Sequence, residues 1–450
     1  MRLTFTDGTT SVEFGHLLTS NLLRQYTPQT PEVDEVRSES PVRDGGEIPI
    51  AAYRNPTENA DVAWTGTLSQ QRAAMQALNL LFGQARRYQR TGMGSRVYCE
   101  FLATDDEAGD YGEAWRSEVL SGRVLVDDGS FRLGLQLEGD FLLSRIIWTR
   151  RYYWEGALVE LALSNQHGTG LGGVTVYDHD DAEHDNTLDI DAADVEGDLP
   201  APCELQFENT YDSYTAAYAI YIAHNVDSDP ANLAHMLPGG TTAACGLTET
   251  WLKTWTLDSA LLQACGGNVF HLLAPIDGLY STAWLKWNLD FGPTTIWSSG
   301  WFNLTTFLGG EILADTGSIR LPPRRMVDTG TPYPLELLLW GKDSGGFTAA
   351  IDIAFVQLSA TDSWRVLQPA GYGIDQGVRL VDDPIEGTLY TEGWSDPGRT
   401  YHYTTLGDPI MLRPGRDQRL YILHGENAWN YTEARTLEVR AWYRARRLVL

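Results

Sequence analysis

Clustered carboxylates beside two histidines are the first residues in this chain whose types and spacing could do chemistry. Residues 176–202, VYDHDDAEHDNTLDIDAADVEGDLPAP, contain ten acidic residues and neither Lys nor Arg. A calcium loop usually has a glycine at its turn, which DHDDAEHDN lacks. Zinc needs three or four His or Cys ligands, and only His179 and His184 are present here. We therefore predict a solvated loop between strands, without a specific metal site, in which residues 178–198 bind cations only adventitiously.

Two further stretches are similar to parts of a serine protease. DSGG at Asp343–Gly346 is similar to the serine loop of chymotrypsin-like proteases, and TAAC at Thr242–Cys245 is similar to their histidine motif. Lys342 stands where that family has a glycine, and TAAC lacks the histidine before its cysteine. Without a general base the Ser344 hydroxyl is not activated. The two matches therefore predict no peptidase, and neither HExxH nor a phosphate-binding glycine loop occurs in the chain.

Carbohydrate chemistry is harder to judge from residue types. The two carboxylates of a glycosidase can lie far apart in sequence, so 60 Asp and Glu residues do not identify a pair. The Trp-rich stretches Trp251–Trp255, Trp284–Trp287 and Trp297–Trp301 could stack on sugar rings or fill the core of a β-sandwich. We favour the core and leave sugar stacking open. No catalytic, cofactor-binding or metal-binding residue is predicted, and the chain is expected not to be an enzyme.

Length and charge limit the remaining classes of protein. A chain of 450 residues, 43% of them hydrophobic, suits two or three folded domains. A formal charge of −27 argues against a surface that grips nucleic-acid phosphates or anionic lipids. The four cysteines contain no CxxC pair and are expected to be reduced and buried. No apolar leader and no run of about 20 apolar residues occurs, so we expect a soluble product made in a cytoplasm.

The first 154 residues show the clearest local signals. Leu3–Phe14 alternates around Asp7-Gly8, which predicts a hairpin. Tyr26–Pro49 is polar and carries prolines, and it is expected to be a long loop or arm. Ser69–Arg90 has apolar residues at helical spacing, with Ser69 as its expected N-cap and Gly92 as the residue expected to end it. We predict a β-sandwich or barrel with one packed helix.

The rest of the chain changes character twice. Residues 155–200 contain 12 acidic residues and no Lys or Arg. After Pro200 the sequence consists of strand-like runs separated by Gly, Pro, Asp and Asn, which predicts a sandwich of jelly-roll type. DPANLAHML, residues 229–237, is the one short helical candidate there.

NTLDIDAADVEGDLPAP (Asn186–Pro202) resembles the segment that enters the jelly-roll module of distal tail and tail-tip (baseplate hub) proteins of long-tailed, siphovirus-like bacteriophages. IDIAFVQLSATDSWRVL (Ile351–Leu367) is similar to a late strand and turn of that module, and Arg416–Leu450 is similar to its closing strands. The N-terminal order of strands, one helix and strands also resembles the β-barrel of tail tube and distal tail proteins.

The resemblance implies a mainly β architecture in three parts. Residues 1–154 would form a tail-tube-like sandwich or barrel with the helix 69–90, and residues 155–200 an acidic β connector. Residues 201–450 would form a jelly-roll sandwich similar to carbohydrate-binding modules. The implied role is a structural ring around the DNA channel, hexameric or pseudo-hexameric, that joins the tail tube protein to hub and tip proteins. It implies a virion protein made in the host cytoplasm, with no cofactor and no specific nucleic-acid binding, and a host-surface glycan as a further candidate partner.

Two features favour a ring on physical grounds. The Tyr26–Pro49 stretch is too long and polar for an internal connector and could reach a neighbouring copy. Open strand edges of a sandwich would be covered by pairing around a ring. Two alternatives stay open: a tail tube or decoration protein of the same virion, and a free carbohydrate-binding or glycan-cleaving protein. The second would be a soluble monomer, usually with a secretion signal.

Overall fold

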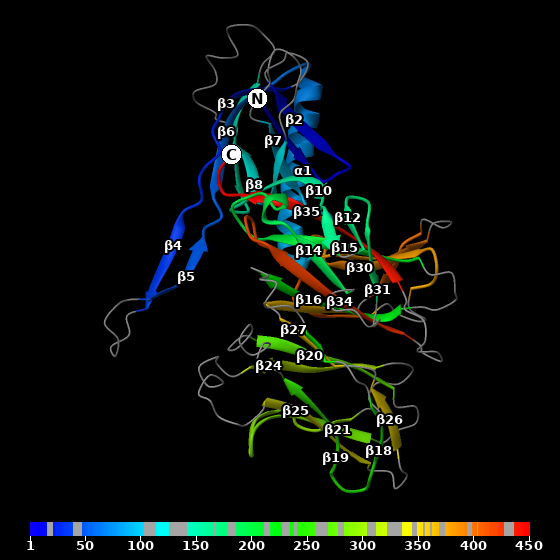
Figure 1. The fold of residues 1–450 in the computed structure, drawn as a ribbon. Helices are drawn as coiled ribbons and strands as arrows, with labels where there is room; N and C mark the ends of the chain where they lie inside the picture. The colour runs from blue at the N-terminus through cyan, green and yellow to red at the C-terminus, as the bar shows by residue number, and fades with distance from the viewer. Residues whose placement is uncertain are drawn as a thin grey trace. The chain divides into compact units, whose positions relative to one another are not determined.

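The chain folds into two compact units. Unit 1 consists of Met1–Leu158, Glu196–Leu199 and Arg444–Leu450, and unit 2 consists of Val159–Val195 and Pro200–Tyr443. The structure is a computed structural model (Figure 1). It describes residues 1–15, 21–38, 47–102, 114–125, 142–165, 167–177, 186–210, 217–226, 235–237, 241–257, 269–277, 283–303, 312–321, 335–343, 349–353, 356–360, 362–368, 374–393, 398–402, 404–426 and 436–450.

Seven strands of unit 1 close into a barrel. Their order is β8-β7-β1-β2-β3-β6-β9, and β9 returns to pair with β8. All neighbours are antiparallel except β2 and β3, which are parallel. The barrel strands are β1 (Arg2–Thr6), β2 (Ser11–Gly15), β3 (Asn21–Tyr26), β6 (Thr57–Trp64), β7 (Tyr98–Leu102), β8 (Trp115–Leu125) and β9 (Leu142–Arg150). Within the described part of the chain, closure leaves none of these seven strands at an open edge, so the edge argument for a ring does not apply to them.

The hairpin predicted at Asp7-Gly8 is confirmed. It joins β1 to β2, and Thr6 pairs with Ser11 across the turn. The Asp7 carboxylate accepts backbone N–H hydrogen bonds from Thr9, at 2.9 Å, and Thr10, at 2.7 Å. Such Asx contacts stabilise the turn that Gly8 completes at φ +87°.

The predicted helix is also confirmed, with a correction at its start. Helix α1 spans Leu68–Thr91, and its N-cap is Thr67 rather than Ser69. Thr67 and Gln70 form a reciprocal capping box, which requires the Gln three residues after the cap. Gly92 ends the helix in the left-handed conformation, φ 65°, as the sequence indicated.

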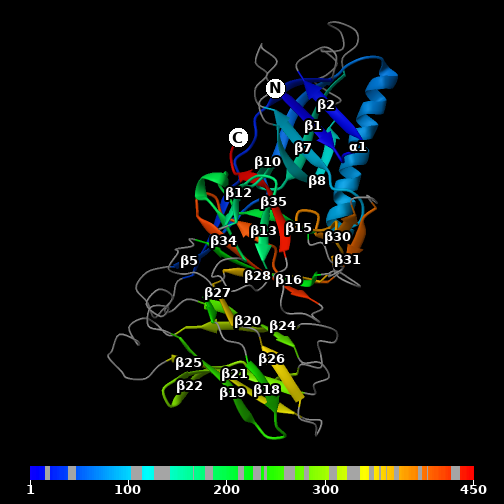
Figure 2. The same ribbon diagram turned by 45° about the vertical axis from the view of Figure 1, so that its right-hand side comes forward.

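One face of α1 packs on the barrel core of unit 1, as Figure 2 shows. The Phe82 ring lies edge-on to Phe5 with centroids 5.4 Å apart, and Phe5 in turn meets Trp148 at 5.1 Å. Gly122 of β8 lies directly beneath Phe82, because a Cβ there would come within 2.5 Å of the ring. The helix and β8 therefore approach closely only because residue 122 has no side chain. Other buried residues of this face are Gln71, Leu78, Leu81 and Ala85.

The end of the chain belongs to unit 1. Arg446 forms an ion pair with Glu155, Nη2 to Oε1 at 3.0 Å, and its guanidinium lies over the Tyr153 ring. Arg444 donates a hydrogen bond to the Gly156 carbonyl at 3.0 Å. Glu155 and Gly156 lie in β10 (Trp154–Glu160), which pairs with β8. Residues at opposite ends of the sequence thus complete one folded unit.

Unit 2 contains one seven-stranded sheet, of order β12-β11-β14-β34-β16-β28-β32. Its strands are β11 (Leu163–Asn165), β12 (Gly168–Gly170), β14 (Thr187–Ile190), β16 (Ala217–Val226), β28 (Ser363–Gln368), β32 (Thr404–Gly407) and β34 (Gln418–Glu426). The other strands outside the insertion described next are β13 (Val174–Tyr177), β15 (Ala201–Asn209), β29 (Val378–Asp383), β30 (Thr388–Gly393), β31 (Thr400–His402), β33 (Met411–Leu412) and β35 (Thr436–Arg447), with a 3₁₀ turn η1 (Ala192–Asp194). Arg365 of β28 and Asp382 of β29 form a buried ion pair at 2.5 Å that joins the two sets of strands.

A second sandwich is inserted between β16 and β28, which pair directly with each other. One of its sheets contains β17 (His235–Leu237), β18 (Thr241–Cys245), β20 (Val269–Asp277), β24 (Ile312–Arg320), β26 (Ala349–Ile353) and β27 (Val356–Ala360). The facing sheet contains β19 (Thr250–Leu257), β21 (Ala283–Phe291), β22 (Thr294–Ser298), β23 (Phe302–Asn303) and β25 (Leu335–Asp343). Residues of both sheets share one hydrophobic core. We call this part the inserted sandwich.

The mainly β fold class is confirmed. Besides the N-cap of α1, one further local prediction is wrong. The end of the helical candidate 229–237 forms strand β17, because His235–Leu237 pairs with β27, while residues 229–234 lie outside the described part. The described part of 155–200 contains all but the first residue of β10, then β11 to β14 and η1. The jelly-roll assignment and the domain boundaries stay predictions. Among the described residues, no helix has the length and apolar character needed to span a membrane.

Candidate assembly site on unit 1

A two-stranded arm leaves the barrel of unit 1 between β3 and β6 (Figure 1). It consists of β4 (Val33–Ser38) and β5 (Glu47–Tyr53), which pair with each other and with no other strand in the described part of the chain. Val33 pairs with Tyr53 at the base of the arm and is 48% exposed. The predicted loop or arm is therefore an arm with regular strands. An isolated pair of strands is only marginally stable in water, so we expect this arm to pack on another protein surface.

The base of the arm is fixed by a buried ion pair. Arg150 at the end of β9 donates from Nε to Glu58 Oε1 of β6 at 2.8 Å, and both side chains are 0% exposed. The same carboxylate accepts the Gln29 backbone N–H at 3.0 Å, and Arg150 Nη2 donates to the Gln29 carbonyl at 2.8 Å. Gln29 lies just before β4, so the pair holds the strand that enters the arm.

The rest of the Arg150 guanidinium also has interaction partners. Arg150 Nη1 donates to the Arg151 carbonyl at 2.8 Å, and the guanidinium lies 4.2 Å from the centre of the Trp154 ring. Burial raises the pKa of the Glu58 carboxyl above its usual value, and the Arg150 charge opposes that rise. A buried ion pair of this kind gives geometric definition more than net stability.

A second contact fixes the returning strand of the arm. The Tyr53 ring stacks on Tyr152 with centroids 5.3 Å apart and an interplanar angle of 16°. The Arg54 backbone N–H donates to the Glu32 carbonyl at 2.8 Å. Both strands of the arm are thus attached to the barrel at their base.

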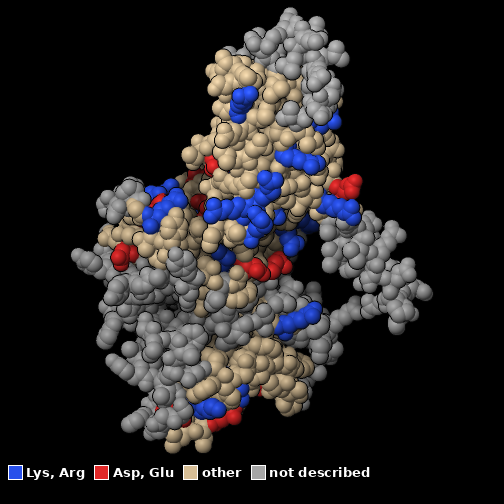
Figure 3. Space-filling model, turned by 180° about the vertical axis from the view of Figure 1, so that it is seen from behind, with Lys and Arg blue, Asp and Glu red and all other residues tan. Residues whose placement is uncertain are grey.

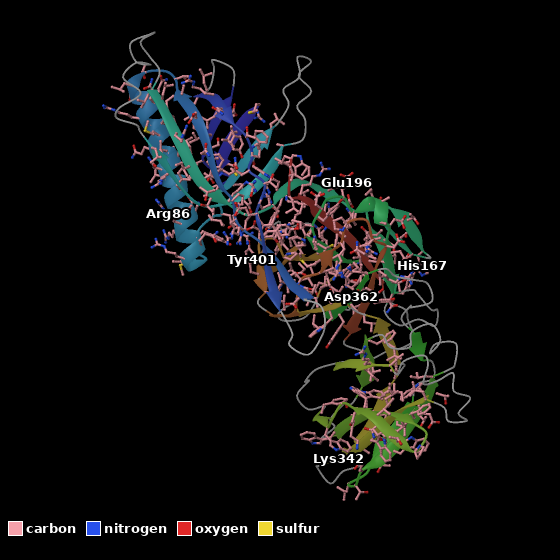
Figure 4. The ribbon with its side chains drawn as sticks, turned by 90° about the vertical axis from the view of Figure 1, so that its left-hand side faces the viewer. Arg86, His167, Glu196, Lys342, Asp362 and Tyr401 are labelled. Carbon is pink, nitrogen blue, oxygen red and sulfur yellow. The ribbon has the colours of Figure 1, made fainter. Side chains whose placement is uncertain are left out.

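The helix α1 presents a basic outer face. Its 24 residues include four arginines and no acidic residue. All four are exposed, and none forms an ion pair with a residue in the described part of the chain. In the rear view of Figure 3, Lys and Arg are more prominent than Asp and Glu over unit 1, and Figure 4 marks one of the four on α1. The four are Arg72, Arg86, Arg87 and Arg90.

The residues that the sequence offered as candidates for catalysis or metal binding do not form an active site in the described part of the chain. Cys245 of TAAC is buried, and burial raises the pKa of its thiol to about 11. Asp343 of DSGG lies beside it and donates its backbone N–H to the Gly246 carbonyl at 2.8 Å, whereas Ser344 lies outside the described residues. His179 and His184 of the acidic run lie outside them too. Over the described ranges, no cluster of three His, Cys, Asp or Glu could hold a metal ion.

The tryptophans divide between core and surface. Trp255 and Trp287 are buried in the inserted sandwich, as the core interpretation expected. We call the sheet of β19, β21, β22, β23 and β25 sheet G. Tryptophans and lysines alternate in one stack on its outer face. Lys342 lies 6.0 Å from the Trp284 ring centre and 4.2 Å from Trp301, and Lys286 lies 4.8 Å from Trp301 and 5.7 Å from Trp340. Figure 4 marks Lys342 in this sheet. The sequence could not show that these residues share one face.

Comparison with known proteins gives structural likeness only. No family model matches the chain, and no curated protein matches it. The crystal structure of the Dit protein of phage SPP1, described as a hub of the adsorption apparatus, is similar over 99% of this chain and 98% of that one, with 10% identity and a TM-score of 0.30. The phage P2 baseplate in its activated conformation with Ca is similar over 49% of this chain and 72% of that one, with 12% identity and a TM-score of 0.28. The same baseplate with Sr gives 11% identity and a TM-score of 0.28.

Proposed function

We propose that this chain is a structural component of a phage tail tip that assembles into a ring around the DNA channel. The ring joins the tail tube to hub and tip proteins, and unit 2 with its inserted sandwich is displayed on the outside. The proposal rests on the resemblance of Asn186–Pro202, Ile351–Leu367 and Arg416–Leu450 to tail-tip proteins. The observation that carries it is the arm of β4 and β5, anchored at its base by Arg150 and Glu58.

The arm supports a ring for a physical reason. A two-stranded sheet that stands alone is only marginally stable, and it gains stability when it packs on another surface. Contact between an arm and a different surface of the next copy is head-to-tail, and such contacts either close into rings or extend into filaments. Because the barrel is closed, the arm and not an open strand edge provides the means of contact. Six copies, or pseudo-six-fold geometry, is the order we propose.

The proposal also accounts for the absence of chemistry among the described residues. A tail-tip component needs rigid contacts with its neighbours rather than a nucleophile or metal. The formal charge of −27 suits a protein beside a DNA channel, because an acidic wall does not retain the passing DNA. The place of action is the virion, after synthesis in the host cytoplasm.

The native mass of the full chain tests this function. We expect light scattering to give the mass of six copies of a 50.0 kDa chain, about 300 kDa, alone or with the tail tube protein present. A tail tube or decoration protein would instead form stacked tubes or bind along the tube. A mass of 50.0 kDa at high concentration with these partners present would overturn the ring.

A second candidate function is glycan binding by the inserted sandwich. The stack of Trp284, Trp301 and Trp340 with two lysines, and Trp251 at 54% exposure on the same sheet, support it. Aromatic faces bind the apolar faces of sugar rings, and lysines donate to hydroxyls. Titration of the full chain with host cell-wall glycan fragments tests it, with Trp301→Ala, at the centre of the stack, as the variant. Equal binding, or none, by both proteins would exclude this face as a glycan site.

A further inference from the structure

All the lysines of this chain lie in sheet G of the inserted sandwich. The chain has 33 basic residues, and every one of them outside sheet G is an arginine, whereas the strands of sheet G contain no arginine. Lysine carries its charge on one compact ammonium with three hydrogen-bond donors, and arginine spreads its charge over a flat fork. Sheet G therefore differs from the rest of the chain in the kind of positive charge that it carries. The lysines are Lys253, Lys286 and Lys342.

The strand register places two of these lysines among tryptophans on the outer face. In β21 the buried positions alternate with Trp284 and Lys286, so these two side chains face away from the core. Trp284 pairs with Lys342 on the neighbouring strand β25. In the next outward pair the order is reversed, because Lys286 pairs with Trp340. Trp301 contacts both ammonium groups, 4.2 Å from that of Lys342 and 4.8 Å from that of Lys286.

The two lysines differ in their acidic partners. Lys286 forms an ion pair with Glu249, so its charge is balanced within the sheet. In the described part of the chain, Lys342 forms no ion pair with a carboxylate. Its half-buried ammonium lies between the rings of Trp284 and Trp301. A partly desolvated charge of this kind gains free energy from an anion that reaches it.

The far end of the same two strands carries the opposite charge. Asp290 of β21 pairs with Glu336 of β25, and both belong to the outward-facing set. They lie roughly 20 Å from Trp284 and Lys342 along the strands, at about 3.3 Å per residue. The outer face of sheet G therefore accepts an anionic group at the Lys342 end and repels one at the other end. A ligand that lies along this face suits it best when its negative charges are sparse.

We infer that the outer face of sheet G binds a sparsely anionic glycan, with sugar rings on Trp284 and Trp301 and a phosphate or carboxylate on the Lys342 ammonium. The inference rests on the glycan binding proposed above for this face and specifies the charge of the ligand. Indole rings pack on the apolar faces of sugars, and an ammonium binds phosphate or carboxylate oxygens through charge-assisted hydrogen bonds.

Single-stranded nucleic acid is the other ligand that combines flat rings with anionic groups. Its bases stack on aromatic side chains and its phosphates contact lysines. It carries a phosphate at every nucleotide, however, whereas this face offers one unbalanced cation and two carboxylates at its far end. The net charge of −27 on the chain also opposes a densely charged strand. A glycan with isolated charges is the better fit.

Calorimetric titration of the full chain with two matched pairs of sugars tests the inference. One pair is maltotetraose with and without a single phosphate. The other is xylotriose bearing one glucuronate and the same sugar after its carboxyl group has been reduced to an alcohol. We expect the charged member of at least one pair to bind at least about tenfold more tightly in low-salt buffer, because a hydrogen bond between charged groups contributes about that factor. The pair that shows the preference identifies the anionic group.

Three variants separate the charge from the aromatic surface. Lys342→Gln should bind the two members of each pair equally, and Trp301→Ala should weaken the binding of both members. Lys253→Gln removes the same charge from the same sheet and is the matched control. Lys253 shares its side of β19 with the buried Trp255, so this variant should keep the full preference. Circular dichroism checks that each variant is folded.

The outcomes distinguish this inference from the glycan site on which it rests. Equal binding of charged and neutral sugars by the unchanged chain would leave the glycan site standing and overturn the inference. A preference that survives in Lys342→Gln, or that Lys253→Gln also loses, would overturn it as well. If none of these sugars binds, the inference is wrong, and the titration with host cell-wall fragments decides separately whether the glycan site stands. If a fluorescent single-stranded oligonucleotide binds instead and Lys342→Gln abolishes that binding, the face is a nucleic-acid site.

Discussion

Arg150 and Glu58 meet 2.8 Å apart in the barrel of unit 1, with neither side chain exposed to solvent. They lie 92 positions apart in the sequence, and both also bind the backbone of Gln29. The pair is the link between the rigid barrel and the arm, so its loss affects both stability and the position of the arm.

The first prediction concerns this pair. Glu58→Gln leaves the Arg150 charge buried without its counter-ion, and we expect it to lower the free energy of unfolding by about 3–5 kcal/mol. The matched control is Asp61→Asn, which breaks the exposed pair of Asp61 with Arg145 and should cost less than about 1 kcal/mol. Denaturant unfolding followed by tryptophan fluorescence measures both. Equal losses for the two variants would show that the buried pair has no special role.

The second prediction concerns the helix. Phe82→Ala removes a fully buried ring that packs on Phe5 and over Gly122, so it should cost about 3–5 kcal/mol. Leu80→Ala, on the exposed side of the same helix, should change stability by no more than about 0.5 kcal/mol in the unassembled protein. Thermal unfolding monitored by circular dichroism compares them. An unchanged melting temperature for Phe82→Ala would contradict the packing described here.

The helix α1 and the hairpin of β1 and β2 could both be predicted from the sequence. Both depend on contacts within a few residues: helical spacing of Leu78 and Phe82, a glycine after the last turn, and Asp7-Gly8 between alternating strands. The N-cap is Thr67 rather than Ser69 because the capping box needs a glutamine three residues after the cap, and Gln70 fits only Thr67. Local signals therefore predicted the elements well and their ends less well.

Long-range relationships could not be predicted in the same way. The pairing of Ile220 with Leu367 places a whole sandwich between two neighbouring strands, and nothing near either residue signals it. The ion pair of Arg446 with Glu155 joins residues 291 positions apart. With 60 acidic residues in the chain, charge alone does not select partners. Such contacts follow from the assembled fold, because many sequence patterns are compatible with each of them.

The third prediction is a dependence of unit 2 on pH. His224 is buried and hydrogen-bonded to Ser363 and Gln418, and burial lowers its pKa to about 4. In the unfolded chain its pKa is about 6.5, so below that pH the unfolded state binds the extra proton. The free energy of unfolding should fall by about 3 kcal/mol between pH 6.5 and pH 4 from this group.

His224→Gln is the variant that isolates this effect, because glutamine does not titrate. The difference in unfolding free energy between the unchanged chain and the variant should shrink as the pH falls through this window. Denaturant unfolding at half-unit pH steps gives the difference. A constant difference from pH 7 to pH 4 would show that the histidine is not held neutral by burial.

The fourth prediction concerns reactivity. The Cys245 thiol is fully buried and its pKa is raised to about 11, so almost none of it is thiolate at neutral pH. Iodoacetamide at pH 7.5 should leave the Cys245 peptide unmodified in the native protein and modify it fully in urea, as mass spectrometry would show. Peptidase assays should give the same background for the unchanged chain, Cys245→Ala and Ser344→Ala. Turnover that either substitution abolishes would contradict a purely structural role.

The central claim, that the arm of unit 1 assembles this chain into a closed ring, is tested most directly by electron microscopy of the full chain with and without its arm. Because Val33 pairs with Tyr53, residues 34–52 can be replaced by a short Gly-Ser link without opening the base of the arm. We predict closed rings of six-fold or pseudo-six-fold symmetry for the unchanged chain and folded monomers for the shortened one. Rings formed equally well without the arm, or monomers in both preparations with tail partners present, would contradict the account.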